Sequence, residues 1–216
     1  MRSDSSQFNG NFKKIFYVLY IDNEIGKCID AVRFIASPKE KHAAHITVRG
    51  PYKRRISVKK INSKLKGNRI RILGVGSFFS TVKKQNTVYF TCDGTKLRDV
   101  WEKKGFGYEP HITIYDGDDF DFAEELYRLM KQFYFDLTFF SDQLAILTTF
   151  PGQTSFESRL FLKEPFINKI LKETNSNLEN NDNLTSRKKI LLIKKICKHL
   201  SSLSSKSPIS RELSFK

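Results

Sequence analysis

The spacing of apolar and polar residues predicts alternating strands and helices over residues 15–162. Short apolar runs are typical of strands, whereas apolar residues that recur every three or four positions are typical of helices. By this criterion, strands are expected at residues 15–21, 44–50, 70–80, 87–92, 110–115, 133–140, 144–150 and 156–162. Helices are expected at residues 24–35, 58–65, 97–104 and 122–132.

The expected elements occur twice in the same order. Strand, helix, strand, helix, strand runs over residues 15–80 and again over residues 87–140. A duplicated order of this kind predicts an α+β fold in which two similar lobes place two antiparallel sheets on either side of a central cleft, with the helices outside. We expect residues 1–164 to form this bilobal domain.

Residues 165–216 are expected to add a basic linker and a helical tail. Residues 175–183 are rich in Asn and Glu, which is typical of a linker. Residues 187–203 predict a basic amphipathic helix, whose apolar face consists of Ile190, Ile193, Cys197 and Leu200. Two interpretations remain open: this face packs on the front domain or on a second copy of the chain, or the helix contacts RNA or a membrane surface.

The charge of the chain narrows the class of partner. The formal net charge is +15 and the isoelectric point is about 9.7. The basic excess is shared between the front domain and the tail. A long-lived partner is therefore expected to be anionic, which means a nucleic acid, a nucleotide or a membrane surface.

Neither a targeting segment nor a metal site is predicted. The first eleven residues are polar and no apolar stretch is long enough to cross a bilayer, so a cytoplasmic location is expected. The three cysteines, Cys28, Cys92 and Cys197, lack the paired spacing that zinc or a redox motif requires. They are expected to be inert thiols, and no cofactor is predicted.

Two nearly identical tetrapeptides carry the candidate chemistry. They are His45-Ile46-Thr47-Val48 and His111-Ile112-Thr113-Ile114, and both lie on the third element of their repeat. Because side chains alternate along a strand, each His is expected to share a face with the Thr two residues on, while the apolar neighbours point into the core. Arg49 and Tyr115 are expected to continue these polar faces.

Two such faces on opposite sides of one cleft are suited to phosphodiester transfer. The reaction needs a base for the attacking oxygen, an acid for the departing oxygen, and donors for the charged phosphoryl oxygens. Histidine suits the first two roles, because its ordinary pKa near 6.5 allows one ring to be neutral and the other charged. Thr47, Thr113 and the guanidinium of Arg49 are candidates for the third role.

The paired motifs resemble those of the 2H phosphoesterase superfamily, which includes the bacterial RNA 2',3'-cyclic phosphodiesterases historically named 2',5'-RNA ligases. The hallmark of that family is two His-x-Thr or His-x-Ser motifs, one in each lobe of a bilobal α+β fold. The resemblance covers roughly residues 12–162 and implies that His45 and His111 are the catalytic pair. It also implies that Thr47 and Thr113 hold the phosphate and that no metal takes part.

The expected function is therefore a hydrolase, a metal-independent phosphodiesterase. Its substrate would be an RNA 2',3'-cyclic phosphate end, a 2'-5' linked oligonucleotide or a cyclic oligonucleotide signal. The alternative is a non-catalytic protein that binds a nucleotide or RNA in the same cleft. The sequence does not indicate which histidine is the acid, nor the oligomeric state.

The residues around the motifs offer weaker predictions about substrate binding. Tyr52 and Tyr115 are expected to stack on a base. The run Lys53-Arg54-Arg55 with Lys59-Lys60 either steers phosphates toward the cleft or forms an ordinary solvated basic face. The other two histidines are expected to be structural. His42 is followed only by alanines, and His199 lies on the helix expected at residues 187–203.

Overall fold

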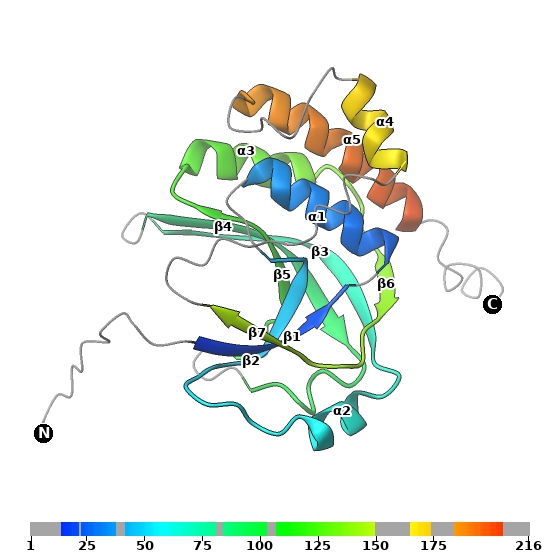
Figure 1. Cartoon of the computed structure of the whole chain (residues 1–216). Coiled ribbons are helices and arrows are strands. Elements are labelled where there is room, and N and C mark those ends of the chain that lie inside the picture. Colours follow the sequence, from blue (N-terminus) through cyan, green and yellow to red (C-terminus); the bar gives the residue numbers. More distant parts are fainter. Residues whose placement is uncertain are drawn as a thin grey trace, which may run out of the picture.

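The structure is a computed structural model of the 216-residue chain. It describes residues 14–21, 23–37, 42–80, 84–102, 107–149, 165–173 and 184–204 (Figure 1). The strand expected at residues 156–162 and the linker expected at residues 175–183 lie outside the described residues.

Within the described residues, seven strands form two antiparallel sheets. The three-stranded sheet has the order β2-β1-β7, with β2 at His45–Tyr52, β1 at Lys14–Tyr20 and β7 at Ala145–Thr149. The four-stranded sheet has the order β5-β4-β3-β6, with β5 at His111–Gly117, β4 at Gln85–Gly94, β3 at Arg69–Ser80 and β6 at Leu137–Phe140. The predicted α+β class with two antiparallel sheets is thus confirmed.

The two halves of the chain exchange strands between the sheets. Strand β3 comes from the first half but pairs with β4 and β6 of the second half. Strand β7 comes from the second half and pairs with β1. Each sheet therefore contains chain from both halves, which ties the halves together by backbone hydrogen bonds.

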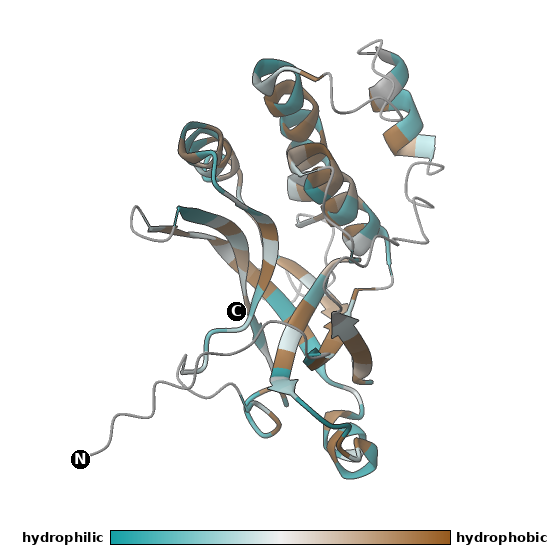
Figure 2. Ribbon diagram, turned by 60° about the vertical axis from the view of Figure 1, so that its left-hand side comes forward, coloured by the Kyte–Doolittle hydropathy of each residue, from teal (hydrophilic) through white to brown (hydrophobic). Residues whose placement is uncertain are grey.

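Of the helices in the described part of the chain, four gather on one side of the sheets, and one short helix lies at the other end (Figure 1). The four are α1 at Glu24–Ala36, α3 at Phe120–Met130, α4 at Pro165–Glu173 and α5 at Ser186–Ser204; the short helix is α2 at Lys59–Leu65. Hydrophilic and hydrophobic residues alternate around the helices and along the strands, as expected of elements with one buried face (Figure 2).

Helices α1 and α3 begin at side-chain caps that the sequence supplies. The Asn23 side chain accepts a hydrogen bond from the Gly26 amide at 3.1 Å, and the Asp119 side chain accepts one from the Phe122 amide at 3.0 Å. Such caps satisfy amide groups that have no partner within the helix. Each helix then packs on α5, and α1 also contacts β5.

The predicted amphipathic helix exists as α5, and its apolar face is buried in the core of the protein. Ile193, Cys197 and Leu200 are fully buried, and they belong to the same core cluster as the strands and α1. The packing interpretation is therefore the one that the structure shows. Ile167 and Ile170 of α4, a helix that the sequence did not predict, join the same core.

Two expected elements differ from the structure. The helix expected at residues 97–104 is wrong over its described part, because residues 95–100 form turns. These turns are held by bonds to the residue three positions earlier, such as Val100 N–H to Leu97 O at 3.2 Å. The strand expected at residues 133–140 begins only at Leu137, since residues 131–136 turn back from α3.

Candidate functional site

Both motifs lie on edge strands that contact each other. His45 is the first residue of β2, and His111 is the first residue of β5. Each strand stands at the edge of its sheet, and the two strands contact one another. The fold thus brings two motifs that are far apart in the sequence onto neighbouring strands.

The predicted division of faces is confirmed over each motif. The four motif residues His45, Thr47, His111 and Thr113 are partly exposed. The residues between and after them, Ile46, Val48, Ile112 and Ile114, are at most 1% exposed. Alternation therefore presents His and Thr together on one side of each strand and buries the apolar residues on the other.

A β-bulge follows the threonine of each motif. In β2, Thr47 lies opposite Val18 but Arg49 lies opposite the adjacent Tyr17, so Val48 is an extra residue. In β5, Thr113 lies opposite Tyr89 but Tyr115 lies opposite the adjacent Val88, so Ile114 is an extra residue. The two motifs therefore end in the same backbone irregularity at the same position.

The two imidazole rings are oriented in the same way. Nδ1 of His45 lies 2.7 Å from the carbonyl oxygen of Ala43, and Nδ1 of His111 lies 2.8 Å from that of Glu109. A carbonyl oxygen can only accept, so Nδ1 carries the hydrogen in both rings. When either ring is neutral, its Nε2 is consequently the nitrogen that can take up a proton.

Backbone contacts fix the segments that supply these carbonyls. The Ala44 amide, between Ala43 and His45, donates to the carboxylate of Asp30 on α1 at 2.5 Å. The Pro110 carbonyl, just before His111, accepts from the Cys92 amide of β4 at 2.9 Å. The segment before each histidine is therefore fixed by a hydrogen bond to another element of the same half, α1 for His45 and β4 for His111.

Aromatic rings that sequence reasoning missed lie beside both histidines. The Tyr20 ring is edge-on to His45 with ring centroids 6.0 Å apart, and the Tyr89 ring lies 5.1 Å from that of His111. His42, which was expected to be structural, lies 6.5 Å from His45. Strand pairing brings Tyr20 opposite His45, and this register is not readable from composition or period.

Gly76 of β3 makes room for the Tyr89 ring. A Cβ atom at position 76 would come within 2.5 Å of that ring, so any other residue opposite Tyr89 would require the ring to move. Burial, and secondarily the charge of Glu109, raise the pKa of Tyr89 above its ordinary value. At neutral pH the phenol next to His111 is therefore protonated and able to donate a hydrogen bond.

Arg49 joins β2 to the segment that precedes β5. Its Nε donates to the Val100 carbonyl at 2.8 Å, and its guanidinium forms an ion pair with Glu102. The Glu102 amide also donates to the Val48 carbonyl at 3.2 Å, at the bulge. Three donors thus join β2 to residues 100–102, and the predicted contact of Arg49 with a phosphate remains a prediction.

Tyr52 lies at the end of β2 and packs partly on the core. Its ring is edge-on to Tyr17, with the ring centroids 5.8 Å apart. Burial, followed by the charge of Glu102, raises the pKa of the Tyr52 phenol. The predicted stacking of Tyr52 on a base remains a prediction.

Tyr115 does not continue the polar face of β5, and this expectation is wrong. The bulge at Ile114 reverses the alternation, so that Tyr115 is only 7% exposed and packs edge-on against Phe122 of α3 at 5.3 Å. Tyr115 is a core residue beneath α3, and its ring is not placed to stack on a substrate. A strand pattern alone does not reveal such a bulge.

His199 is structural, as predicted. Its Nε2 lies 2.9 Å from a carboxylate oxygen of Glu24, in the first turn of α1, and its ring stacks on Phe166 of α4 at 3.7 Å. It therefore joins three helices on the side opposite α2 (Figure 1).

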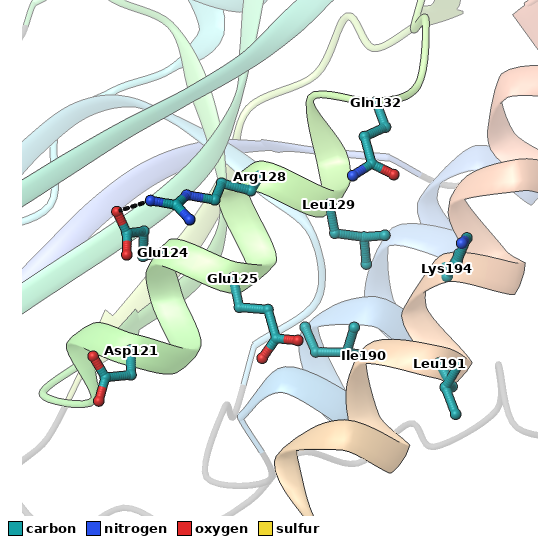
Figure 3. Close-up of a pocket in the computed structure, with 9 residues that line it drawn as sticks. All are labelled: Asp121, Glu124, Glu125, Arg128, Leu129, Gln132, Ile190, Leu191 and Lys194. Carbon is teal, nitrogen blue, oxygen red and sulfur yellow. Dashed lines mark hydrogen bonds and ion pairs between the residues drawn. The ribbon is translucent and has the colours of Figure 1, made fainter.

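A groove of about 360 Å³ runs between α3 and α5, apart from the motif strands (Figure 3). Figure 3 shows Glu125 and Leu129 of α3 pointing toward Ile190 of α5. The groove is lined by both acidic and basic residues: Asp121, Glu124, Glu125, Arg128 and Lys194. No residue of β2 or β5 lines it.

Within the described part of the chain, no group of three or more His, Cys, Asp or Glu side chains is arranged to hold a metal ion. Among the described helices, none has the length and apolar character needed to cross a membrane.

Comparison of the chain with protein-family models, with curated proteins and with solved structures finds no match. The geometry of the two motifs is therefore the main ground on which a function can be argued.

Proposed function

We propose that this protein is a metal-independent phosphodiesterase with His45, Thr47, His111 and Thr113 at its catalytic centre. Its substrates would be RNA 2',3'-cyclic phosphate ends, 2'-5' linked oligonucleotides or cyclic oligonucleotide signals. The resemblance of the two motifs to those of the 2H phosphoesterases agrees with this reaction and leaves the choice among these substrates open.

The observation that carries the proposal is the matched geometry of the two motifs. Each imidazole donates from Nδ1 to the carbonyl two residues earlier, each threonine follows on the same face, and each strand then bulges. A single strand histidine with such contacts would be unremarkable. Two that agree in all three respects, on strands in contact, are what a centre with two proton-transferring groups requires.

The proposal includes a cleft shared by two related halves. The contact between β2 and β5 and the three donors between β2 and residues 100–102 favour such an arrangement. The repeated order β-α-β in the first half and β-turn-β in the second favours a common origin of the two halves. The substrate phosphate would lie between the two His-Thr faces.

Proton transfer follows from the ring orientation. For a 2',3'-cyclic phosphate, Nε2 of the neutral histidine takes a proton from water as the water oxygen bonds to phosphorus. The P–O bond to one ribose oxygen breaks, and Nε2–H of the protonated histidine delivers its proton to that oxygen. The product is a phosphomonoester, and one water has been added. The threonine hydroxyls donate to the non-bridging oxygens.

This division of roles predicts a bell-shaped dependence of kcat/KM on pH. At low pH both rings are protonated and the base is lost, whereas at high pH both are neutral and the acid is lost. The near-identical surroundings of the rings leave the assignment of acid and base open.

The test is a substrate panel with product analysis by chromatography. The wild-type protein is expected to convert at least one of the three substrate classes, with or without EDTA, and the double variant H45A/H111A to convert none. The variant H199A serves as a control, since it removes a histidine outside the site. Loss of turnover in EDTA, or conversion by the double variant, would overturn the proposal. Binding without conversion by the wild type would favour a non-catalytic nucleotide-binding protein.

A further inference from the structure

A hollow adjoins the first histidine. It has a volume of about 340 Å³ and is lined by Tyr20, Phe140, Ser141, Asp142, Gln143, Leu144 and Ala145. Tyr20 also contacts the ring of His45, so one aromatic side chain is common to the hollow and the motif. Phe140, which also lines the hollow, is 66% exposed.

Helix α2 and the turn after it are attached to the rim of this hollow. The Asn62 side chain accepts from the Leu144 amide at 3.0 Å, and the Asn68 side chain donates to the Ser141 carbonyl at 3.0 Å. The Gly67 amide donates to the Asp142 carboxylate at 3.3 Å. Hydrogen bonds therefore join the loop that forms the hollow to α2 and to the turn after it.

The exposed side of α2 and of the loop that precedes it is strongly basic. We define the α2 basic surface as seven cations, all exposed: Lys53, Arg54, Arg55, Lys59, Lys60, Lys64 and Lys66. Residues 41–92 contain 13 Lys and Arg and no Asp or Glu. Much of the charge of +15 is thus concentrated in the stretch that contains this surface.

The basic surface is held rigidly by apolar anchors beneath it. Leu65 is fully buried, and Ile56, Val58 and Ile61 pack against the core. The Tyr17 hydroxyl donates to the Ile56 carbonyl at 3.1 Å and accepts from the Ile56 amide at 2.6 Å. The cations therefore project from a fixed backbone, which suits them to a polyanion with regularly spaced charges.

Arg69 and Phe140 connect the basic surface with the hollow. The Arg69 guanidinium lies over the Phe140 ring, 5.3 Å from its centroid, and Arg69 itself is exposed. An exposed aromatic ring next to cations is the combination on which single-stranded nucleic acids bind, with bases stacked and phosphates neutralised.

We propose that the hollow between Tyr20 and Phe140, together with the α2 basic surface, is a track for a single RNA strand. A nucleotide next to the scissile phosphate occupies the hollow, and the following phosphates lie along α2. This inference rests on the proposed function and names the substrate: an RNA end of several nucleotides, in preference to a free cyclic mononucleotide.

A membrane surface fits the same charges less well. Basic helices that lie on membranes bury an exposed apolar face among the lipids. The apolar side of α2 is instead turned into the core, and within residues 53–66 no large apolar side chain is among the exposed ones.

The experiment compares binding and cleavage for two lengths of substrate. Fluorescence anisotropy measures the affinity for a single-stranded 12-mer RNA with a 2',3'-cyclic end, and chromatography measures kcat/KM for this RNA and for a cyclic mononucleotide. The test variant is K59Q/K60Q/K64Q, and the matched control is K188Q/K194Q/K198Q, which removes three exposed lysines from α5.

The α2 variant is expected to bind the 12-mer at least tenfold more weakly. Its salt slope should fall by about 2, since each lost phosphate contact to a single strand removes about 0.7. The α5 control should bind within about threefold of wild type, and both variants should keep the wild-type kcat/KM for the mononucleotide. F140A, which removes an exposed ring, should also weaken 12-mer binding by about fivefold or more, the size of one stacking contact.

Three outcomes would overturn the track. These are wild-type affinity and salt slope in the α2 variant, an equal loss in the α5 control, or binding to anionic phosphatidylserine vesicles through the α2 lysines without binding to RNA. Because anisotropy needs no turnover, the two proposals fail separately. RNA binding through α2 without cleavage of any substrate would refute the phosphodiesterase and leave the track standing.

Discussion

At the scale of the residue, the threonines are the part of the candidate site with the most specific task. Thr47 and Thr113 each follow a histidine on the partly exposed face and stand just before the bulge. A hydroxyl at that place can donate to a phosphoryl oxygen as negative charge develops on it. Such donors act mainly on the transition state, so their loss should appear in kcat.

Replacing either threonine by valine keeps its branched shape and removes the hydroxyl. We expect T47V and T113V each to lower kcat by about 10²–10³-fold, the typical effect of removing one oxyanion donor. T47S and T113S should retain most activity, and T138V, on β6, should behave as wild type. Steady-state kinetics checks this, and wild-type kcat in both valine variants would remove the threonines from the mechanism.

Strand alternation was sufficient to predict which motif residues share a face, because burial of Ile46 and Ile112 enforces it. It failed for Tyr115, where the bulge at Ile114 turns the side chain inward. It also missed Tyr20 and Tyr89, because their places beside the histidines depend on packing between elements rather than on local pattern.

The cysteines illustrate a residue-scale property that follows from burial. Cys28, Cys92 and Cys197 form no disulfide bond, and each is at most 6% exposed. Burial raises the pKa of Cys197 to about 12, and it raises the pKa of Cys92 as well. The thiolate, which is the reactive form, is therefore scarce at ordinary pH.

The folded protein is accordingly expected to be almost inert toward an aromatic disulfide reagent at pH 8. The same reagent should titrate three thiols after unfolding in guanidinium. Rapid reaction of any thiol in the absence of denaturant would contradict the burial of these side chains.

At the scale of the element, β2 is joined to the segment between β4 and β5 through residues 100–102. Residues 95–100 form turns rather than the predicted helix, and Glu102 pairs with Arg49 of β2. Arg49 completes this connection through Val100 and Glu102. Amphipathic spacing of Leu97 and Val100 suggested a helix, but three-residue turns bury the same two side chains.

A double-mutant cycle of R49Q and E102Q measures this connection. Arg49 is 17% exposed at its side chain, so its pair with Glu102 is partly shielded from water. We expect a coupling energy of about 1 kcal/mol in urea unfolding.

The exposed pair Glu124–Arg128 provides the control, with an expected coupling of about 0.3–0.5 kcal/mol for its spacing on a helix. Absence of coupling between Arg49 and Glu102 would mean that the guanidinium is available for substrate, as the sequence alone had suggested.

Element type was otherwise well predicted where apolar periodicity was long, as in α1, α3 and α5. These helices bury one face, and burial imposes the period that the sequence displays. Helix α4 was missed because it is only nine residues long, and its place is determined by contacts with α5.

At the scale of the whole molecule, α5 completes the core. It packs on α1, α3, α4 and β6, which come from both halves of the chain. The sequence predicted the helix but not its location, because an apolar stripe does not specify what will cover it. Ile193 and Ile196 of α5 are fully buried in this core.

The variant I196A is therefore expected to destabilise the protein by about 2–5 kcal/mol, the usual effect of truncating a buried isoleucine. L191A, at a position on the same helix that is 52% exposed, should change stability by less than about 0.5 kcal/mol. Urea unfolding followed by circular dichroism compares the two. Equal stability of I196A and wild type would show that α5 does not contribute to the core.

In the proposed mechanism, two imidazoles from different sheets act on one phosphate. When two groups act as a unit, removing both lowers kcat by less than the product of the two single losses. When they act independently, the losses of kcat multiply. A double-mutant cycle of His45 and His111 therefore tests whether the two rings act together, and not only whether each residue is needed.

The decisive measurement is kcat on an RNA oligonucleotide with a 2',3'-cyclic end for wild type, H45A, H111A and H45A/H111A, each shown to be folded by its thermal transition. Each single variant should lose about 10²–10⁴-fold, as expected for a general acid or base, and the double variant should lose little more than either. Wild-type kcat in either single variant, or a double loss equal to the product of the single losses, would contradict a shared catalytic centre.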